Sequence, residues 1–133
     1  MQNNVTYKIL SVEEREIWPL EEVKNYLRVS HKNDDKLITN LISSAVITAE
    51  QFLALSFCIK KVTCVIDRTP NYLRLKYIPV ASLTKVFLLN GEDKKDITED
   101  FGYVEDNRQK IWIKQKYLSQ KVEINYEAGL GDK

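Results

Sequence analysis

The stretch LRVSHKNDDKLI, residues 27–38, separates two apolar segments and decides how the first third of the chain folds. Its ends belong to the apolar segments, and the residues between them are mostly polar. Asn33 or Asp34 can cap the free amide groups at the start of a following helix. Asp35 is well placed at the positive end of that helix dipole. The stretch therefore predicts a loop between two helices.

The same stretch offers His31, Asn33, Asp34 and Asp35 as metal ligands, so a metal site is the alternative. A calcium loop needs oxygen ligands at regular spacing, a glycine in the turn and a distal glutamate. The glycine is absent here, and a helix is predicted directly after the aspartates. A single histidine in such a loop is most simply a solvated residue. We therefore expect no metal, no cofactor and no catalytic residue.

Two amphipathic helices flank the loop. Pro19 suits the first helical position because its missing N–H would have no partner there. Leu20, Val23 and Leu27 then form one apolar stripe. The second helix is the clearer one, because its apolar residues recur at helical spacing for about four turns. They are Leu37, Ile38, Leu41, Ile42, Ala45, Val46, Ala49, Phe52 and Leu53.

The second helix also has a neutral face with small polar residues, Ser43, Ser44 and Thr48. A neutral face on a long helix is compatible with packing against a partner. It is equally compatible with a second, partly buried face within the same domain. The sequence leaves both interpretations open.

After Phe57 the apolar pattern changes to a period of two, which is typical of strands. The segments concerned are IKKVTCVID (59–67), YLRLKYI (72–78), SLTKVFLLNGED (82–93), FGYVEDNRQKIWIK (101–114) and KVEINYEAG (121–129). Asn90-Gly91 is a strong hairpin signal. Two helices followed by consecutive strands predict an α+β fold with an antiparallel sheet of about five strands.

We expect one domain over residues 1–133. It consists of an N-terminal arm (1–18), a helical hairpin (19–57) and an antiparallel β region (58–128). Within the arm, the alternation of Val5, Tyr7 and Ile9, followed by Leu10, indicates a short strand or an extended segment.

Composition excludes several classes of protein. The formal net charge of +1 argues against a dedicated duplex-DNA binder. With one histidine, Cys58 and Cys64 do not make a zinc site. No signal peptide and no run of about 20 apolar residues is visible, so we expect a cytosolic protein with reduced thiols and no membrane partner.

Aromatic and basic residues gather around the last predicted hairpin. They are Tyr103, Trp112 and Tyr117 with Lys110, Lys114 and Lys116. Such residues can stack on single-stranded nucleic acid, or the tryptophan can pack in the sheet while the lysines line an edge. If Ile111 and Ile113 face the core, Trp112 lies on the opposite face among lysines. An exposed tryptophan there would be a contact surface for another protein or subunit.

The order of these segments resembles the head–tail connector, or head-completion adaptor, proteins of tailed bacteriophages and prophages. The first part of the match is the segment PLEEVKNYLRVSHKNDDKLITNLISSAVITAEQFL. Its matching residues are Leu20, Glu21, Glu22, Val23, Lys24, Leu27, Arg28, Val29, Asp34, Leu37, Ile38, Ala45, Ala49 and Phe52. The segments YIPVASLTKVFLLNGE (77–92) and VEINYEAGLGD (122–132) are similar to later parts of the family pattern.

The resemblance implies a structural protein that forms a homo-oligomeric ring, typically of twelve subunits, under the portal protein. The ring would join the capsid to a head-completion or tail protein, with DNA only as passing cargo. Similar proteins normally continue past the glycine-rich ending with a proline and one or two helices. We expect the neutral face of the second helix and the Trp112 edge to form subunit or portal contacts.

Two alternatives belong to other classes. The two helices could form a DNA-reading helix–turn–helix, but the second helix offers only Lys36, Asn40 and Gln51 to bases, and the connecting loop is long for that motif. A small hydrolase using His31, Asp34 and Asp35 has the least support.

Overall fold

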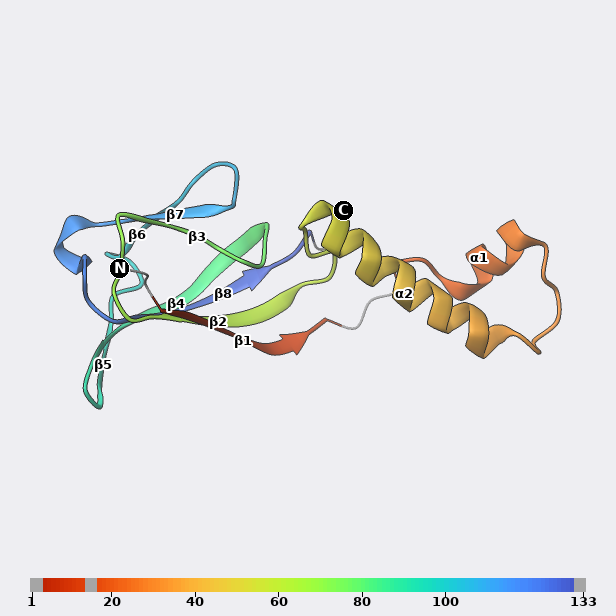
Figure 1. Ribbon diagram of the computed structural model, residues 1–133, viewed down its shortest axis with the longest axis horizontal. Coiled ribbons are helices and arrows are strands. Elements are labelled where there is room, and N and C mark those ends of the chain that lie inside the picture. The colour runs from red at the N-terminus through yellow and green to blue at the C-terminus, as the bar shows by residue number, and fades with distance from the viewer. Residues whose placement is uncertain (1–3, 14–16, 131–133) are drawn as a thin grey trace.

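The computed structural model describes residues 4–13 and 17–130 of the chain. Its elements in chain order are β1 (Val5–Val12), α1 (Leu20–Leu27), α2 (Asp35–Leu53), β2 (Lys60–Ile66), β3 (Tyr72–Arg74), β4 (Val80–Asn90), β5 (Asp93–Asp96), β6 (Gly102–Val104), β7 (Lys110–Ile113), the 3-10 turn η1 (Gln115–Tyr117) and β8 (Val122–Ala128). Figure 1 shows an elongated molecule with the strands at one end and the helical hairpin at the other.

The strands form two antiparallel sheets. The larger has the order β1-β2-β8-β4-β5 and the smaller the order β3-β7-β6. The core lies between the two sheets and contains residues of both, including the fully buried Val62, Ile111 and Ile124, together with Phe101 just before β6.

The alternating pattern of the sequence explains which side chains enter this core. In β2, Val62, Cys64 and Ile66 are buried, while their neighbours are less buried or exposed. In β8, Val122, Ile124, Tyr126 and Ala128 are buried in the same way. Successive side chains of a strand point to opposite faces of the sheet, so one face of each strand joins the core. These predictions are confirmed.

Two expectations for the β region are corrected. The predicted single sheet of about five strands is two sheets of five and three strands. In the predicted arm the strand alternative is confirmed, but the strand, β1, is not a separate arm: it pairs antiparallel with β2 and joins the larger sheet ahead of the helices. Its Val5 and Tyr7 pack against the core, which makes β1 an integral edge of the larger sheet. Residues 1–3 and 14–16 of the arm lie outside the described residues.

The helical hairpin projects from one end of the sheets (Figure 1). Pro19 occupies the N-cap of α1, one position earlier than expected, and its carbonyl accepts the amide of Val23. Asp34 occupies the N-cap of α2, but neither helix has a side-chain capping hydrogen bond. The predicted capping role of Asn33 or Asp34 is therefore wrong.

An ion pair joins the two helices instead. Lys24 of α1 is buried, and its Nζ lies 2.6 Å from Oδ1 of Asp35 in the first turn of α2. The two atoms are at ion-pair distance, but they do not form a hydrogen bond, and Asp35 Oδ1 accepts none from elsewhere. Asp35 also lies at the positive end of the α2 dipole, as the sequence predicted.

Polar contacts attach the base of α2 to the sheets. The backbone N–H of Phe57 donates to Glu50 Oε2 at 2.8 Å. The ammonium of Lys60 lies 3.5 Å from the same oxygen and donates to Ser56 Oγ at 3.2 Å. Beside this joint, the close approach of β8 requires Gly129, because a Cβ there would lie 2.5 Å from the carbonyl oxygen of Cys58. These contacts set the direction in which the hairpin leaves the sheets.

Candidate functional site

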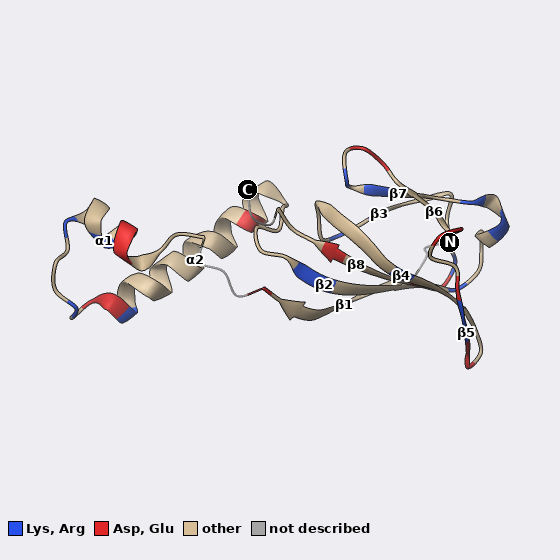
Figure 2. Ribbon diagram, turned by 180° about the vertical axis from the view of Figure 1, so that it is seen from behind, with Lys and Arg blue, Asp and Glu red and all other residues tan. Residues whose placement is uncertain are grey.

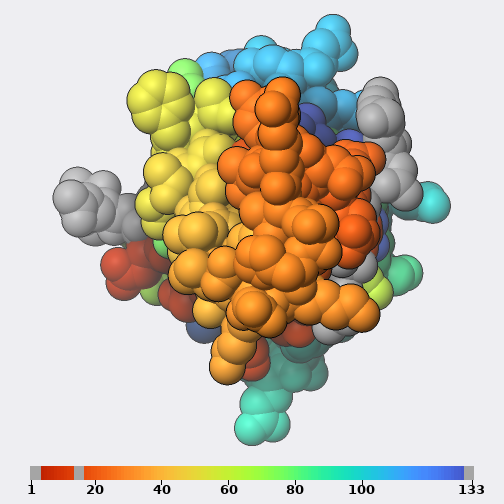
Figure 3. Space-filling view, turned by 90° about the vertical axis from the view of Figure 1, so that its right-hand side faces the viewer, coloured from red at the N-terminus to blue at the C-terminus, as the bar shows by residue number. Residues whose placement is uncertain are grey.

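The hairpin exposes far more apolar surface than a helix normally shows. Only Ile38 of α2 is fully buried among its apolar side chains. Eight large apolar side chains on or beside the helices are about half exposed or more. We call them the hairpin surface: Trp18, Tyr26, Leu27, Leu37, Leu41, Ile47, Phe52 and Leu53. Figure 3 views the molecule from this end, where the two helices form most of the near surface.

The middle of α2 carries no charge. Every residue from Leu37 to Ala49 is apolar or uncharged, and the helix is tan along this length in Figure 2. Exposed surfaces normally carry charged residues, so an exposed helix without them indicates a surface that another molecule covers.

The small polar residues predicted as an interface are exposed. Ser43, Ser44 and Thr48 all face away from the packed side of α2. Helical spacing places Ser44 and Thr48 on one face with Leu37, Leu41 and Phe52. We call these five residues the outer stripe. The alternative of a second face buried within the same domain is wrong for these side chains, because all are exposed.

A groove of about 340 Å³ runs between α2 and the start of the hairpin. Its apolar walls include Val12, Trp18, Ile42 and Val46, with Ser43 at its rim. Trp18 also lines a second hollow beside α1. The groove is open, and its charged lining residues, Glu50 and Lys60, pair with each other. The remaining walls are mainly apolar and suit an apolar side chain.

A second exposed surface lies on the outer face of the small sheet. The strand register places Tyr72, Trp112 and Tyr103 side by side across β3, β7 and β6. The rings of Tyr72 and Trp112 have centroids 5.2 Å apart. Tyr72 and Tyr103 are exposed and Trp112 is half-buried, while Ile111 and Ile113 are buried on the other side. We call Tyr72, Trp112 and Tyr103 the aromatic row.

The predicted facing of β7 is confirmed, because the isoleucines face the core and Trp112 lies on the opposite face with Lys110. The predicted exposure of Trp112 is found only in part, since its side chain is half-buried. Tyr72 is a member of this surface that the sequence did not indicate. The alternating pattern places Tyr72 and Arg74 on the same face of a strand. The position of Tyr72 beside Trp112 depends on the pairing of β3 with β7, which are distant in the chain.

Tyr117 does not belong to this surface. It is buried, its ring packs near Phe101, and its hydroxyl donates to Asp100 Oδ2 at 2.6 Å. Asp100 also forms ion pairs with Lys114 and Lys116. These hydrogen bonds and charges hold the pKa of the Asp100 carboxyl well below its usual range. Of the three clustered lysines, two thus serve a surface network of ion pairs centred on Asp100.

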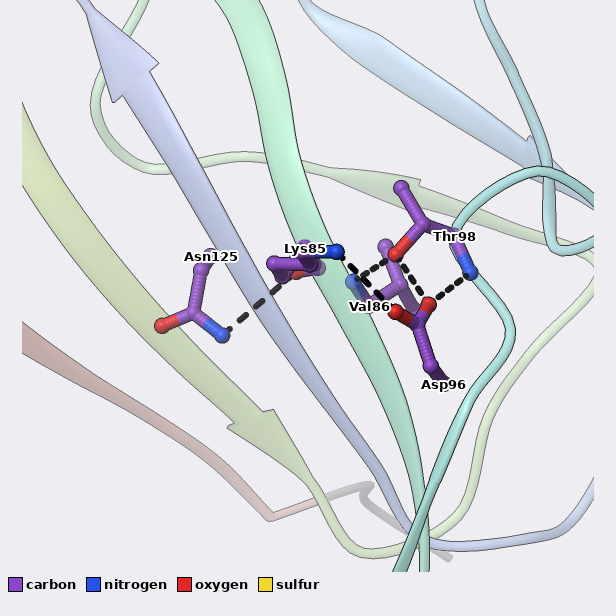
Figure 4. A network of polar contacts seen from close by, with 5 residues as sticks. All are labelled: Lys85, Val86, Asp96, Thr98 and Asn125. Carbon is purple, nitrogen blue, oxygen red and sulfur yellow. Dashed lines mark hydrogen bonds and ion pairs between the residues drawn. The ribbon is translucent and has the colours of Figure 1, made fainter.

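A second network supports the edge of the larger sheet, as Figure 4 shows. Asp96 accepts hydrogen bonds from the hydroxyl and the backbone N–H of Thr98, and pairs with Lys85 at 3.1 Å. The Thr98 hydroxyl in turn accepts the amide of Val86, and Asn125 donates to the carbonyl of Lys85. The bonds from Thr98 and then Lys85 lower the pKa of Asp96 from 3.8 to about 2.

This network predicts a loss of stability in acid. Because the folded pKa of Asp96 is depressed, its ionised form stabilises the fold above about pH 4, and this contribution is lost as the pH falls toward 2. The difference in melting temperature between the wild type and Asp96→Asn should shrink across this range in a pH series of thermal melts. A constant difference from pH 6 to pH 2 would contradict the assignment.

The loop residues first considered as ligands are not brought together. His31, Asn33 and Asp34 are exposed at the end of the hairpin, and Asp35 pairs with Lys24. Among the described residues, no three His, Cys, Asp or Glu side chains are grouped so as to hold a metal ion. Cys64 is fully buried, and burial raises the pKa of its thiol to about 12. In the described ranges, neither helix has the length and apolar character to cross a membrane.

Comparisons with known proteins agree with an interaction protein. A family model described as phage gp6-like head-tail connector protein matches residues 19–107, which include both helices and the strands from β2 to β6. No curated protein matches the chain. The fold is similar to a chain in a solved structure, "Neck of empty GTA particle computed with C6 symmetry", with a TM-score of 0.73 and 19% identity. That match covers 95% of this chain and 72% of the other.

Proposed function

The chain belongs to the phage gp6-like head–tail connector family, and we propose that copies of it form a closed ring between the portal and the next protein of the head–tail junction. The family is structural, so the chain is a connector and not an enzyme. The resemblance found in the sequence is confirmed by the family match. Ring formation, the portal and the partner on the tail side are the proposed parts.

The hairpin surface is the observation that carries the proposal. A large apolar side chain has about 200 Å² of surface, so the eight exposed residues together present on the order of 1,000 Å². These side chains lie on more than one face of the hairpin, so the area is shared between faces. For scale, the largest single apolar patch of a typical monomer is about 300–600 Å², and a stable interface buries about 800 Å² on each partner. A protein with this much exposed apolar surface is expected to bury it in an assembly.

A ring also needs a contact between two different surfaces of neighbouring subunits that closes by rotation. The outer stripe of α2 and the groove beside Trp18 are two such surfaces. Ser44 and Thr48 lie between Leu41 and Phe52 on the outer stripe, and their small side chains allow another helix to approach closely. We assign Ser44 and Thr48, on the outer stripe, and Ser43, which lines the groove, to the subunit or portal contacts on this basis.

The twelve copies implied by the resemblance are part of the proposal. The solved structure with the same fold is of a neck computed with C6 symmetry, and a ring of twelve also obeys a six-fold axis. The joint between Glu50 and Lys60 supports treating residues 1–133 as one unit that enters the ring whole. DNA would pass through the ring as cargo, which fits a net charge near zero.

The helix–turn–helix alternative has less support. A recognition helix needs several basic or amide side chains facing the bases, whereas the length of α2 between Leu37 and Ala49 carries no charge and a single amide, Asn40.

The purified chain tests the proposal directly. We expect ring-shaped particles by negative-stain electron microscopy, and a mass that is a multiple of the 15.5 kDa subunit by native mass spectrometry. Addition of purified portal should raise the yield of rings and give portal–ring complexes. A chain that stays monomeric at high concentration and in the presence of portal would overturn the proposed ring.

A further inference from the structure

One part of the larger sheet extends beyond its neighbours. The pairing of β4 with β8 ends at Leu88, but its pairing with β5 continues to Asn90 and Asp93. β5 is the last strand of the sheet, and all four of its residues are exposed. We call residues 90–95 the ribbon. A two-stranded ribbon without further support is only marginally stable in water, so a partner would stabilise it.

The aromatic row has the composition of a protein-binding surface. Tryptophan, tyrosine and arginine are the residues most often found at the energetic centre of protein interfaces. Arg74 lies opposite Lys110 in the register of β3 and β7, directly beside the row. The Lys110 ammonium lies 4.9 Å from the centroid of the Tyr72 ring. This face therefore combines flat apolar rings with two cations.

The ribbon and the aromatic row lie on opposite sides of the β region. In Figure 1, β5 projects below the sheets while β7 lies above them. Figures 2 and 3 show the same arrangement from two other directions. Two complementary surfaces on opposite sides of one subunit are what a head-to-tail contact requires.

The charges of the two surfaces are complementary. Glu92 and Asp93 form the acidic tip of the ribbon, visible in red in Figure 2, and neither has an ion-pair partner among the described residues. Arg74 and Lys110 likewise have no carboxylate partner in the described part of the chain. The ribbon also contains Lys94 and Lys95, but Lys94 pairs with Glu123 of β8 at 3.5 Å. With that pair set aside, Lys95 offsets one of the two ribbon carboxylates, and Glu105 offsets one of the two cations beside the row. Each surface then keeps a net charge of about one unit, and the two signs are opposite.

We propose that the ribbon of one copy docks on the aromatic row of the next, with Glu92 and Asp93 against Arg74 and Lys110. The inference rests on the proposed ring and names a second subunit contact in it, separate from the hairpin surface. The tyrosine and tryptophan rings cover the backbone of the ribbon, and the four charges fix its register.

Charge reversal with complementation tests the contact. The face variant is Arg74→Glu/Lys110→Glu, and the ribbon variant is Glu92→Lys/Asp93→Lys. Each alone places like charges across every contact, so each should need at least about tenfold more protein to assemble than the wild type. In an equimolar mixture, a ring in which the two variants alternate has opposite charges at every contact. We expect the mixture to assemble like the wild type and to contain the two chains in a ratio of one to one.

The control is Lys8→Glu/Lys32→Glu, which changes the net charge as the face variant does at two exposed positions away from both surfaces. It should assemble normally, and thermal melts should show that all variants are folded. If the wild type forms rings and both charge-reversal variants assemble equally well, the ribbon does not dock on the aromatic row. The proposed ring would still stand. Variants that are both defective and stay defective when mixed would also overturn this contact. Absence of any wild-type ring would overturn the proposed function, and this inference with it.

Discussion

Replacing Phe101 with alanine should lower the free energy of unfolding by about 3–5 kcal/mol. Phe101 is fully buried between the sheets, where its ring lies 6.4 Å from that of Tyr117. Removing it leaves a cavity that the surrounding strands cannot fill without moving. Because a domain of this size has a total stability of about 5–15 kcal/mol, the loss is a large fraction of it. Urea unfolding followed by circular dichroism measures the change.

The chain contains a matched control. Phe52 is the same residue type, but 88% of its surface is exposed on α2. Phe52→Ala should change the free energy of unfolding by less than about 0.5 kcal/mol. If the two variants had equal effects, either the core would not lie between the sheets or the hairpin would not be exposed in the isolated subunit. The comparison thus tests the division between a β core and an uncovered hairpin.

The sequence predicted the parts of this fold that depend on neighbouring residues. The alternation of Val62, Cys64 and Ile66 identifies a strand and its buried face, because both follow from the local geometry of an extended chain. The helical spacing of α2 is equally local. The turn at Asn90-Gly91 was also predicted, and it joins β4 to β5.

The arrangement of strands in two sheets could not be predicted in the same way. Pairing of β3 with β7 joins residues about forty positions apart, and nothing in either strand specifies the other. The same reason explains the error over Tyr117. Its position near lysines in the sequence indicated a surface, but its ring is buried beside Phe101 and its hydroxyl donates to Asp100. The local sequence pattern predicts which side chains of a strand share one face. Which other residues those side chains contact depends on tertiary pairing, which the local pattern does not specify.

The hairpin shows a further limit of sequence patterns. The apolar repeat of α2 predicted a helix with one face covered, and the structure leaves much of that repeat exposed. A periodic apolar stripe indicates that one face of a helix is buried in the functional state. It does not indicate whether that face is buried by the same chain or by another. For Leu37, Leu41 and Phe52, the proposed cover is a neighbouring subunit.

Leu41→Asp should therefore abolish ring assembly while the isolated subunit stays folded. Leu41 is 59% exposed at the centre of the outer stripe. In the subunit, a carboxylate there stays in water, so the melting temperature should change little. In the ring, it would be buried without a partner at every contact, which costs several kcal/mol each time. We expect assembly to require at least about 100-fold more protein, as measured by mass photometry across a concentration series.

Thr39→Asp is the control, since it adds the same charge to an exposed position on another face of the same helix. Helical spacing places Thr39 away from Leu41, so this variant should form rings as the wild type does. Loss of rings in both variants would mean that charge anywhere on α2 prevents assembly, which contradicts a contact made by the outer stripe. If Leu41→Asp formed normal rings, the outer stripe would not be part of the subunit contact, and the proposed role of the hairpin surface would be wrong. We expect Leu41→Asp, but not Thr39→Asp, to lose ring assembly, because the outer stripe of α2 is proposed to be buried between copies of the chain.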